Sequence, residues 1–227
     1  FAPFRALIGF RSDRFKSALG LRRLPYIFKG TMLQFGGFAI MPFALLVLSG
    51  YGEAIDAPRW IGLSSAALAF LLVGAGVHIV QTIGLALATD LVPEEDQPKV
   101  VGLMYVMLLV GMAVAAIVIG TLLQNFSQLR LIQVVQGAAV MTVVLNVIAL
   151  WKQERVNPMS RAEREAEKPS FGDAWRDLTT GNSAARLLAA VFLGTLAFNM
   201  QDVLLEPYGG EVLGLSVSAT TLLTALW

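Results

Sequence analysis

The sequence has 227 residues, of which 56% are hydrophobic and 15% are charged, against about 25% charged in a typical globular protein. The net charge of +1 gives no reason to expect a nucleic-acid partner, and the absence of cysteine excludes disulfides and cysteine-based metal or catalytic sites. We therefore expect a membrane protein.

Five apolar stretches are long enough to cross a membrane, since a spanning helix needs about 20 apolar residues. They cover residues 26–49, 60–89, 100–123, 129–150 and 187–206. Residues 1–10 are expected to end an earlier helix and residues 216–227 to begin a later one, so we interpret the chain as an internal portion of a longer protein. Continuous apolarity without alternation predicts helices and not barrel strands. The predicted fold class is an all-α polytopic membrane protein.

Lysine and arginine are distributed unevenly among the loops, and cytoplasmic loops retain these residues. Fifteen of the 17 lie in residues 1–29, 90–99 and 151–186, whereas Arg59 and Arg130 lie on the other side of the spans. The bias places the first group of segments in the cytoplasm. Every span then crosses once, as a multi-pass protein requires.

The only long polar stretch, residues 152–185, divides the chain. We predict a cytoplasmic linker there, between part of an N-terminal helical bundle, residues 1–151, and the start of a C-terminal helical bundle, residues 186–227. Within the linker, Ser160 is followed three residues later by Glu163, which predicts a short helix. A charged linker held in water is the alternative.

The first basic segment reads GFRSDRFKSALGLRRLPYI, residues 9–27. It resembles the loop between helices two and three of the major facilitator superfamily, where a charged latch holds the cytoplasmic side closed. The residues that carry this resemblance, and the expected cytoplasmic gate, are Gly9, Asp13, Arg14, Gly20, Arg22 and Arg23. Lys16 stands where the superfamily has a glycine. A basic loop that only orients the protein is the alternative.

The order of the spans agrees with this resemblance. Five whole spans follow the basic segment, and the linker comes after the fourth, which matches two six-helix bundles joined by a cytoplasmic linker. We therefore expect the major facilitator superfamily fold, incomplete, from the end of helix two to the start of helix eight.

Three long phrases carry a closer resemblance: ALIGFRSDRFKSALGLRRLPYIFKGTMLQFGGFAIMPFALL, HIVQTIGLALATDLVPEEDQPKVVGLMYVML and NMQDVLLEPYGGEVLGLSV. They resemble the PucC/LhaA family, the bacteriochlorophyll-delivery branch of the superfamily. The resemblance implies a light-harvesting complex assembly factor that delivers bacteriochlorophyll to antenna subunits, or chaperones them, in the inner, intracytoplasmic photosynthetic membrane of a phototrophic bacterium. The implied cofactor is bacteriochlorophyll, and the implied partners are antenna subunits, the reaction-centre core and membrane lipid.

His78 is the only histidine and lies within the apolar run LLVGAGVHIVQTIGLAL. With the resemblance, its imidazole is expected to bind pigment magnesium as an axial ligand, and this is the only metal contact we predict. Gln81 and Thr82, one turn further on, are expected to bond ring carbonyls, and Gly74 is expected to leave room for a flat ring. A structural histidine bonded to a neighbouring helix is the alternative.

Asp202 and Glu206 lie four residues apart, on one face of the last whole span. Such acids carry proton coupling in many transporters, unless they lie in the headgroup zone beside the exit turn expected at Pro207. A proton-coupled transporter of a small solute is therefore one alternative function, and a structural subunit of a photosynthetic complex is another. No span carries a basic residue suited to an anionic solute, and no catalytic motif occurs, so we expect no enzyme.

Overall fold

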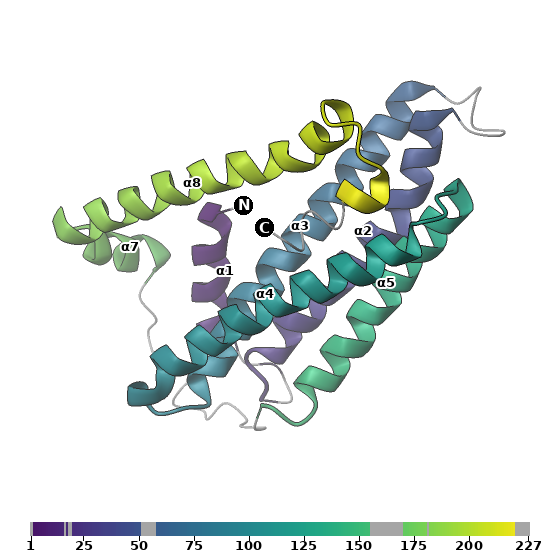
Figure 1. Ribbon diagram of the computed structural model, residues 1–227. Helices are drawn as coiled ribbons and strands as arrows, with labels where there is room; N and C mark the ends of the chain where they lie inside the picture. The colour runs from purple at the N-terminus through teal and green to yellow at the C-terminus, as the bar shows by residue number, and fades with distance from the viewer. Residues whose placement is uncertain are drawn as a thin grey trace. The chain divides into compact units, whose positions relative to one another are not determined.

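The structure is a computed structural model that describes residues 2–15, 17, 20–50, 58–154, 170–180 and 182–220. For residues 2–3, 182–183, 201–202 and 205–206 it describes the backbone alone. All regular elements among the described residues are helices (Figure 1). They are α1 (Ala2–Arg14), α2 (Leu24–Ser49), α3 (Arg59–Asp90), the short 3-10 helix η2 (Glu94–Asp96), α4 (Gln97–Leu122), α5 (Gln128–Leu150), α7 (Phe171–Thr179) and α8 (Asn182–Glu211).

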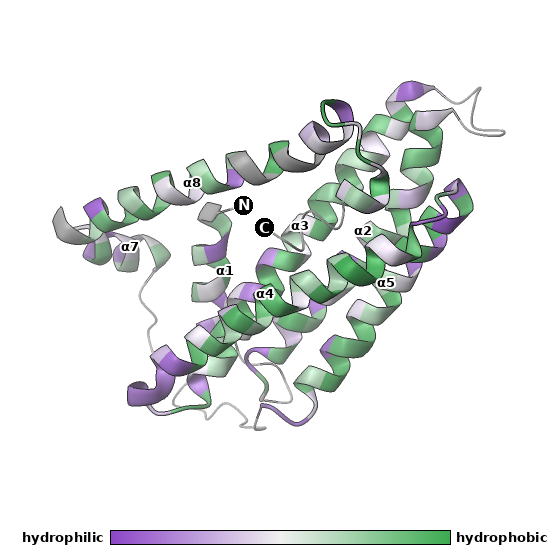
Figure 2. Ribbon diagram, in the orientation of Figure 1, coloured by the Kyte–Doolittle hydropathy of each residue, from purple (hydrophilic) through white to green (hydrophobic). Residues whose placement is uncertain are grey.

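Four of the helices are long and apolar enough to cross a membrane: α2, α3, α4 with η2, and α5. A fifth span is formed if the bent pair Phe171–Thr179 and Ala184–Met200 counts as one. Figure 2 shows apolar colour along these helices and polar colour near their ends. The predicted all-α polytopic class is confirmed, and the arrangement of the major facilitator superfamily stays a prediction.

The chain divides into two compact units. The first comprises Phe1–Leu108 and Asn125–Ser160, and the second comprises Leu109–Gln124 and Arg161–Trp227. Within the first unit, α3 packs against α1 and α2, and α2 also packs against α5. Within the second, α7 packs against α8. The boundaries predicted for the two bundles and the linker stay a prediction.

Glycines bring the backbones of α2 and α3 into direct contact. A Cβ atom on Gly37 of α2 would lie 2.7 Å from the carbonyl oxygen of Ala69, and one on Gly30 would lie 3.0 Å from that of Gly76. These positions therefore have no room for a side chain, because only small residues allow two helices to approach so closely.

The apolar core of the first unit lies where α1, α2, α3 and α5 meet. Ile27 of α2 packs with Ile83 and Leu87 of α3, and all three are buried. Ile8 of α1 and Leu150 of α5 pack against them. The core thus supports the end of α3, at which the charged residues described below gather.

Two helix ends differ from those expected. α1 continues four residues beyond position 10, to Arg14, so much of the predicted basic loop is helical. α8 runs through Pro207 to Glu211, and the exit turn predicted at Pro207 is wrong. A proline removes one helical hydrogen bond without having to end the helix. The chain turns later, near Gly214, whose φ of +65° favours glycine.

α7 was not predicted from the sequence. The short helix expected to begin after Ser160 lies outside the described residues, whereas α7 begins after Ser170, whose hydroxyl accepts a bond from the Asp173 amide at 3.2 Å. Phe171 and Trp175 stack with ring centroids 6.1 Å apart. The axis of α7 is bent 96° from that of Ala184–Met200. An amphipathic helix at this angle to an apolar helix is typical of segments that lie at a membrane surface.

The later helix expected from residue 216 is described only at its start. Residues 217–220 are helical, and residues 221–227 lie outside the described residues. The Ser218 hydroxyl donates to the carbonyl oxygen of Gly120 at 2.9 Å, which joins this segment to the end of α4 within the second unit.

Candidate functional site

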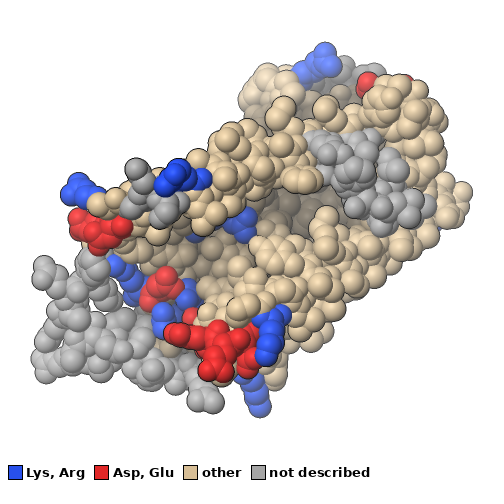
Figure 3. Space-filling model, turned by 60° about the vertical axis from the view of Figure 1, so that its left-hand side comes forward, with Lys and Arg blue, Asp and Glu red and all other residues tan. Residues whose placement is uncertain are grey.

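A group of charged and polar side chains lies at one end of the first unit, and we call it the charge cluster. It comprises Ser12 and Asp13 of α1, Arg23 before α2, Asp90 at the end of α3, and Glu154 after α5. Figure 3 shows that charged atoms gather in patches on the visible face, with uncharged surface between them.

Arg23 is the centre of the charge cluster and is only 5% exposed. Its Nη1 atom lies 2.5 Å from Asp13 Oδ1, and its Nε atom lies 3.0 Å from Asp90 Oδ2. Nη1 also donates to the Ser12 hydroxyl at 2.7 Å, which in turn donates to the Gly9 carbonyl at 2.8 Å. These bonds offset the cost of burying the guanidinium.

The electrostatics of Arg23 follow from the same contacts. Burial alone lowers the pKa of the guanidinium, but the hydrogen bond to Asp90 and the charges of Asp13 and Asp90 outweigh it, so the pKa is raised above its usual value. The centre of the charge cluster is therefore a permanent cation.

Glu154 caps the first turn of α2. Its carboxylate accepts bonds from the backbone N–H groups of Arg22 at 2.6 Å, Arg23 at 3.0 Å and Leu24 at 2.9 Å. These groups have no partner within the helix and carry partial positive charge. α2 has no side-chain cap of its own, since its N-cap residue is Arg23. Glu154 thus supplies a cap from a distant part of the chain and joins the end of α5 to the start of α2.

Replacement of Glu154 by alanine is expected to lower the free energy of unfolding by about 1–2 kcal/mol, the range of N-cap and helix-dipole contributions. Thermal unfolding of the full-length protein in nanodiscs, followed by helicity, measures it. Glu95→Ala is the matched control, because Glu95 is exposed and no hydrogen bond involves its side chain within the described residues. An equal loss in both variants would contradict the capping role.

The structure brings most of the predicted gate residues together. Asp13 and Arg23 form an ion pair, and the Arg22 guanidinium donates to the Asp13 carbonyl oxygen at 3.0 Å. Gly20 has a φ of +78° in the turn between α1 and α2. Arg14 instead lies over the Phe10 ring, with its guanidinium carbon 3.8 Å from the ring centroid. The gating role of these residues stays a prediction.

Three members of the charge cluster were not predicted from the sequence: Ser12, Asp90 and Glu154. Glu154 was assigned to the linker, and Asp90 was counted only as part of a loop. Both pair with residues 67 to 132 positions away, and no local pattern reports such a pairing. One signal was available, because Asp90 and Glu154 both lie in segments that the distribution of lysine and arginine places on the same side of the membrane as Arg23.

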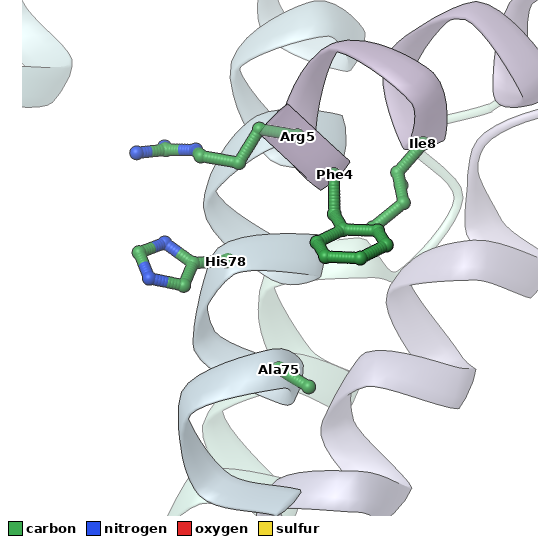
Figure 4. A pocket seen from close by; sticks show the side chains of 5 residues that line it. All are labelled: Phe4, Arg5, Ile8, Ala75 and His78. Atoms are coloured by element: carbon green, nitrogen blue, oxygen red, sulfur yellow. The ribbon is translucent and has the colours of Figure 1, made fainter. Parts of the chain in front are cut away.

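A small pocket lies between α1 and α3, lined by Phe4, Arg5, Ile8, Ala75 and His78 (Figure 4). Its volume is about 220 Å³, and apart from Arg5 and His78 its lining is apolar. Figure 4 shows the imidazole of His78 and the guanidinium of Arg5 extending in the same direction from their two helices. We call this site the apolar pocket. It combines the predicted pigment ligand with a cation that the sequence analysis did not assign.

The other residues predicted to bind pigment do not line the apolar pocket, and only one of them lies beside it. Thr82 adjoins the apolar pocket, and its hydroxyl accepts a bond from Arg5 Nε at 3.0 Å. Gln81 is exposed and Gly74 is half-buried, and neither lines the pocket. Gly76, two residues from Gly74, faces α2. The pigment-binding roles of all these residues stay predictions.

Arg5 is a basic residue beside a span, although α1 itself is not among the helices long and apolar enough to cross a membrane. α1 packs against α3, and Arg5 bonds Thr82, which lies eight residues before the end of α3, or about 12 Å along the helix axis. The cation therefore lies between α1 and α3, away from the end of α3. Its surroundings were not readable from the sequence, since its partners lie 77 positions away.

Asp202 and Glu206 both lie on α8, four residues apart. Their side chains are outside the description, so their proposed proton coupling stays a prediction. Among the described residues, no group of three or more histidine, aspartate or glutamate residues is placed to hold a metal ion.

Comparison with known proteins decides the family. The family model described as PUCC protein matches residues 1–227. The chain belongs to the PUCC protein family. Protein PucC of Rhodobacter capsulatus is 66% identical over 228 residues, which is 100% of this chain and 50% of that protein. Protein PucC of Rhodovulum sulfidophilum is also 66% identical over 228 residues, which is 99% of this chain and 50% of that protein.

A more distant relative is the Bacteriochlorophyll synthase 44.5 kDa chain of Rhodobacter capsulatus, 27% identical over 218 residues, covering 96% of this chain and 48% of that protein. The chain thus spans about half the length of the PUCC relatives that it matches. No solved structure matches it. The predicted resemblance to the PucC/LhaA family is confirmed.

Proposed function

We propose that the whole protein is a light-harvesting complex assembly factor, which delivers bacteriochlorophyll to antenna subunits or chaperones them in the intracytoplasmic membrane of a phototrophic bacterium. Membership of the PUCC family, with 66% identity to Protein PucC of Rhodobacter capsulatus, supports a role in the photosynthetic light-harvesting system. The name of the distant relative supports a connection with bacteriochlorophyll. The proposal that the protein binds pigment is based on the apolar pocket, whose lining includes His78.

The residues of the apolar pocket fit one edge of a flat pigment ring. A neutral imidazole held in an apolar wall suits the axial position of magnesium. At about 220 Å³, the pocket is smaller than the roughly 300–1,000 Å³ of sites that enclose a ligand. His78 would therefore hold the ring near its metal, while Phe4 and Ile8 exclude water. When bound, the pigment supplies light absorption, and the chain supplies position and orientation.

The charge cluster and the apolar pocket share two helices. Asp13 stands at the end of α1 and Asp90 at the end of α3, and Arg23 bonds to both. The same two helices form the walls of the apolar pocket. Loss of the ion pairs would release α1 from α3 and widen the pocket. We therefore assign the charge cluster as a cytoplasmic gate that controls entry or release of the pigment.

The test of the proposal is His78→Phe in the full-length protein, expressed in a phototrophic host that lacks its own copy. Loss of the ligand is expected to lower antenna assembly by at least about tenfold, as for weakened metal sites. Near-infrared absorption of whole cells at equal protein level measures assembly. Leu68→Phe, at an exposed position of α3 outside the apolar pocket, is the control. Unchanged assembly with His78→Phe would contradict the proposal.

A further inference from the structure

We propose that the apolar pocket takes its pigment as a free acid, with the carboxylate of an unesterified side chain bound by Arg5 and the ring held at His78. This inference rests on the proposed function for the identity of the ring. It adds the chemical form in which the pigment enters.

The guanidinium of Arg5 is oriented by the protein but not neutralised by it. Its Nε atom donates to the Thr82 hydroxyl at 3.0 Å. Within the described part of the chain, no other hydrogen bond and no ion pair involves Arg5. A guanidinium has five donors in one plane, so its two terminal nitrogens remain for a ligand. That fork matches a carboxylate, which it binds through two parallel hydrogen bonds.

The depth of the two anchors suits a molecule with one charged end. α3 has 32 residues, which makes it about 48 Å long against a hydrocarbon core of about 30 Å. If α3 is centred, Thr82 lies about 3 Å inside the hydrocarbon and His78 about 9 Å inside. Arg5 is therefore near the boundary, where a charge is tolerated if it is paired, and the imidazole lies deeper.

The walls of the apolar pocket argue against a small hydrophilic anion. Phe4, Ile8 and Ala75 offer no side-chain hydrogen bond, so a second polar group on the ligand would lose its hydration without compensation. The ligand must couple one anionic group to a large apolar body. A tetrapyrrole free acid has this chemistry. An anionic lipid is the other source of the same chemistry.

The experiment uses the full-length protein in nanodiscs of zwitterionic lipid and two probes, bacteriochlorophyllide and its methyl ester. The probes share ring and magnesium and differ in one charge. We expect the unaltered protein to bind the acid at least about tenfold more tightly than the ester, as for a charge-assisted hydrogen bond. Arg5→Gln should lose this preference and keep its affinity for the ester. Arg11→Gln, the same change at an exposed position of α1, should keep the preference.

Thr82→Val is a second variant, in which the charge is unchanged but the hydroxyl that orients Arg5 is removed. It should weaken binding of the acid severalfold and leave binding of the ester unaltered. Equal weakening of both probes by Arg5→Gln and Thr82→Val would overturn the inference.

Three further outcomes separate this inference from the proposed function. Equal affinity of the unaltered protein for acid and ester would overturn the inference and leave pigment binding standing. No binding of either probe would overturn both. Addition of phosphatidylglycerol to the nanodiscs tests the lipid source: if it abolishes the preference for the acid, the anion site belongs to lipid and the inference fails.

Discussion

Replacement of Gly76 by alanine is expected to lower the free energy of unfolding by about 3 kcal/mol or more, the upper end of the cost of overpacking. The added Cβ atom would meet the Gly30 carbonyl oxygen and would lie 2.8 Å from the Gln34 amide nitrogen. Both are backbone atoms of α2, which cannot rotate away as a side chain can. The two helices must therefore separate along their whole contact.

The matched control for this effect is Gly84→Ala on the same helix. A Cβ atom there would have nothing within 4 Å, and alanine favours a helix over glycine by about 1 kcal/mol. Thermal unfolding of the full-length protein in nanodiscs should show a large loss for Gly76→Ala and none for Gly84→Ala. Similar behaviour of the two variants would contradict the close crossing of α2 and α3.

The second large effect is expected from Arg23→Ala, which should lower the free energy of unfolding by about 2 kcal/mol. Removal of one partner from a buried ion pair costs about 3–5 kcal/mol. Here the side chains of Asp13 and Asp90 are 53% and 46% exposed, so water reduces the cost. Thermal unfolding measures the loss. With one cysteine introduced into α1 and one into the facing side of α3, disulfide formation between the two helices should be slower, because α1 is released.

Arg22→Ala is the control for Arg23→Ala, since it removes the neighbouring positive charge. Its side chain bonds only the Asp13 carbonyl oxygen within the described residues, and its backbone bond to Glu154 is retained. We expect a change of about 0.5 kcal/mol or less. If Arg22→Ala destabilised as much as Arg23→Ala, net charge and not the geometry of the charge cluster would explain the effect.

The fold class was predictable because a bilayer leaves few choices. A long apolar run must satisfy its own backbone hydrogen bonds, so residues 24–49 and 128–150 could only be helices. Helix ends are set by weaker local effects, which is why the end of α1 and the course of α8 through Pro207 were missed. α7 carries local signals, a capping box at Ser170 and Asp173 and an amphipathic pattern, and it was missed because the polar stretch was assigned as a linker whose one helix was expected after Ser160.

The candidate sites were predictable only in part. His78 stood out because an ionisable side chain in an apolar run is costly and usually functional. Arg5 did not, because its place beside Thr82 depends on the packing of α1 on α3. Surfaces for partners could not be predicted either: α4 exposes apolar residues such as Leu103 and Ile117, and lipid and protein partners both favour such a surface.

Pigment carriage by the apolar pocket is measured by the absorption spectrum of the purified protein. The full-length protein would be isolated in mild detergent from a pigment-producing host, with His78→Leu prepared in parallel, and its pigment extracted and quantified. We expect bacteriochlorophyll in near-equimolar amount, and a clear loss in His78→Leu at the same protein yield. A colourless protein at normal yield, or equal pigment in both preparations, would contradict pigment carriage by the apolar pocket.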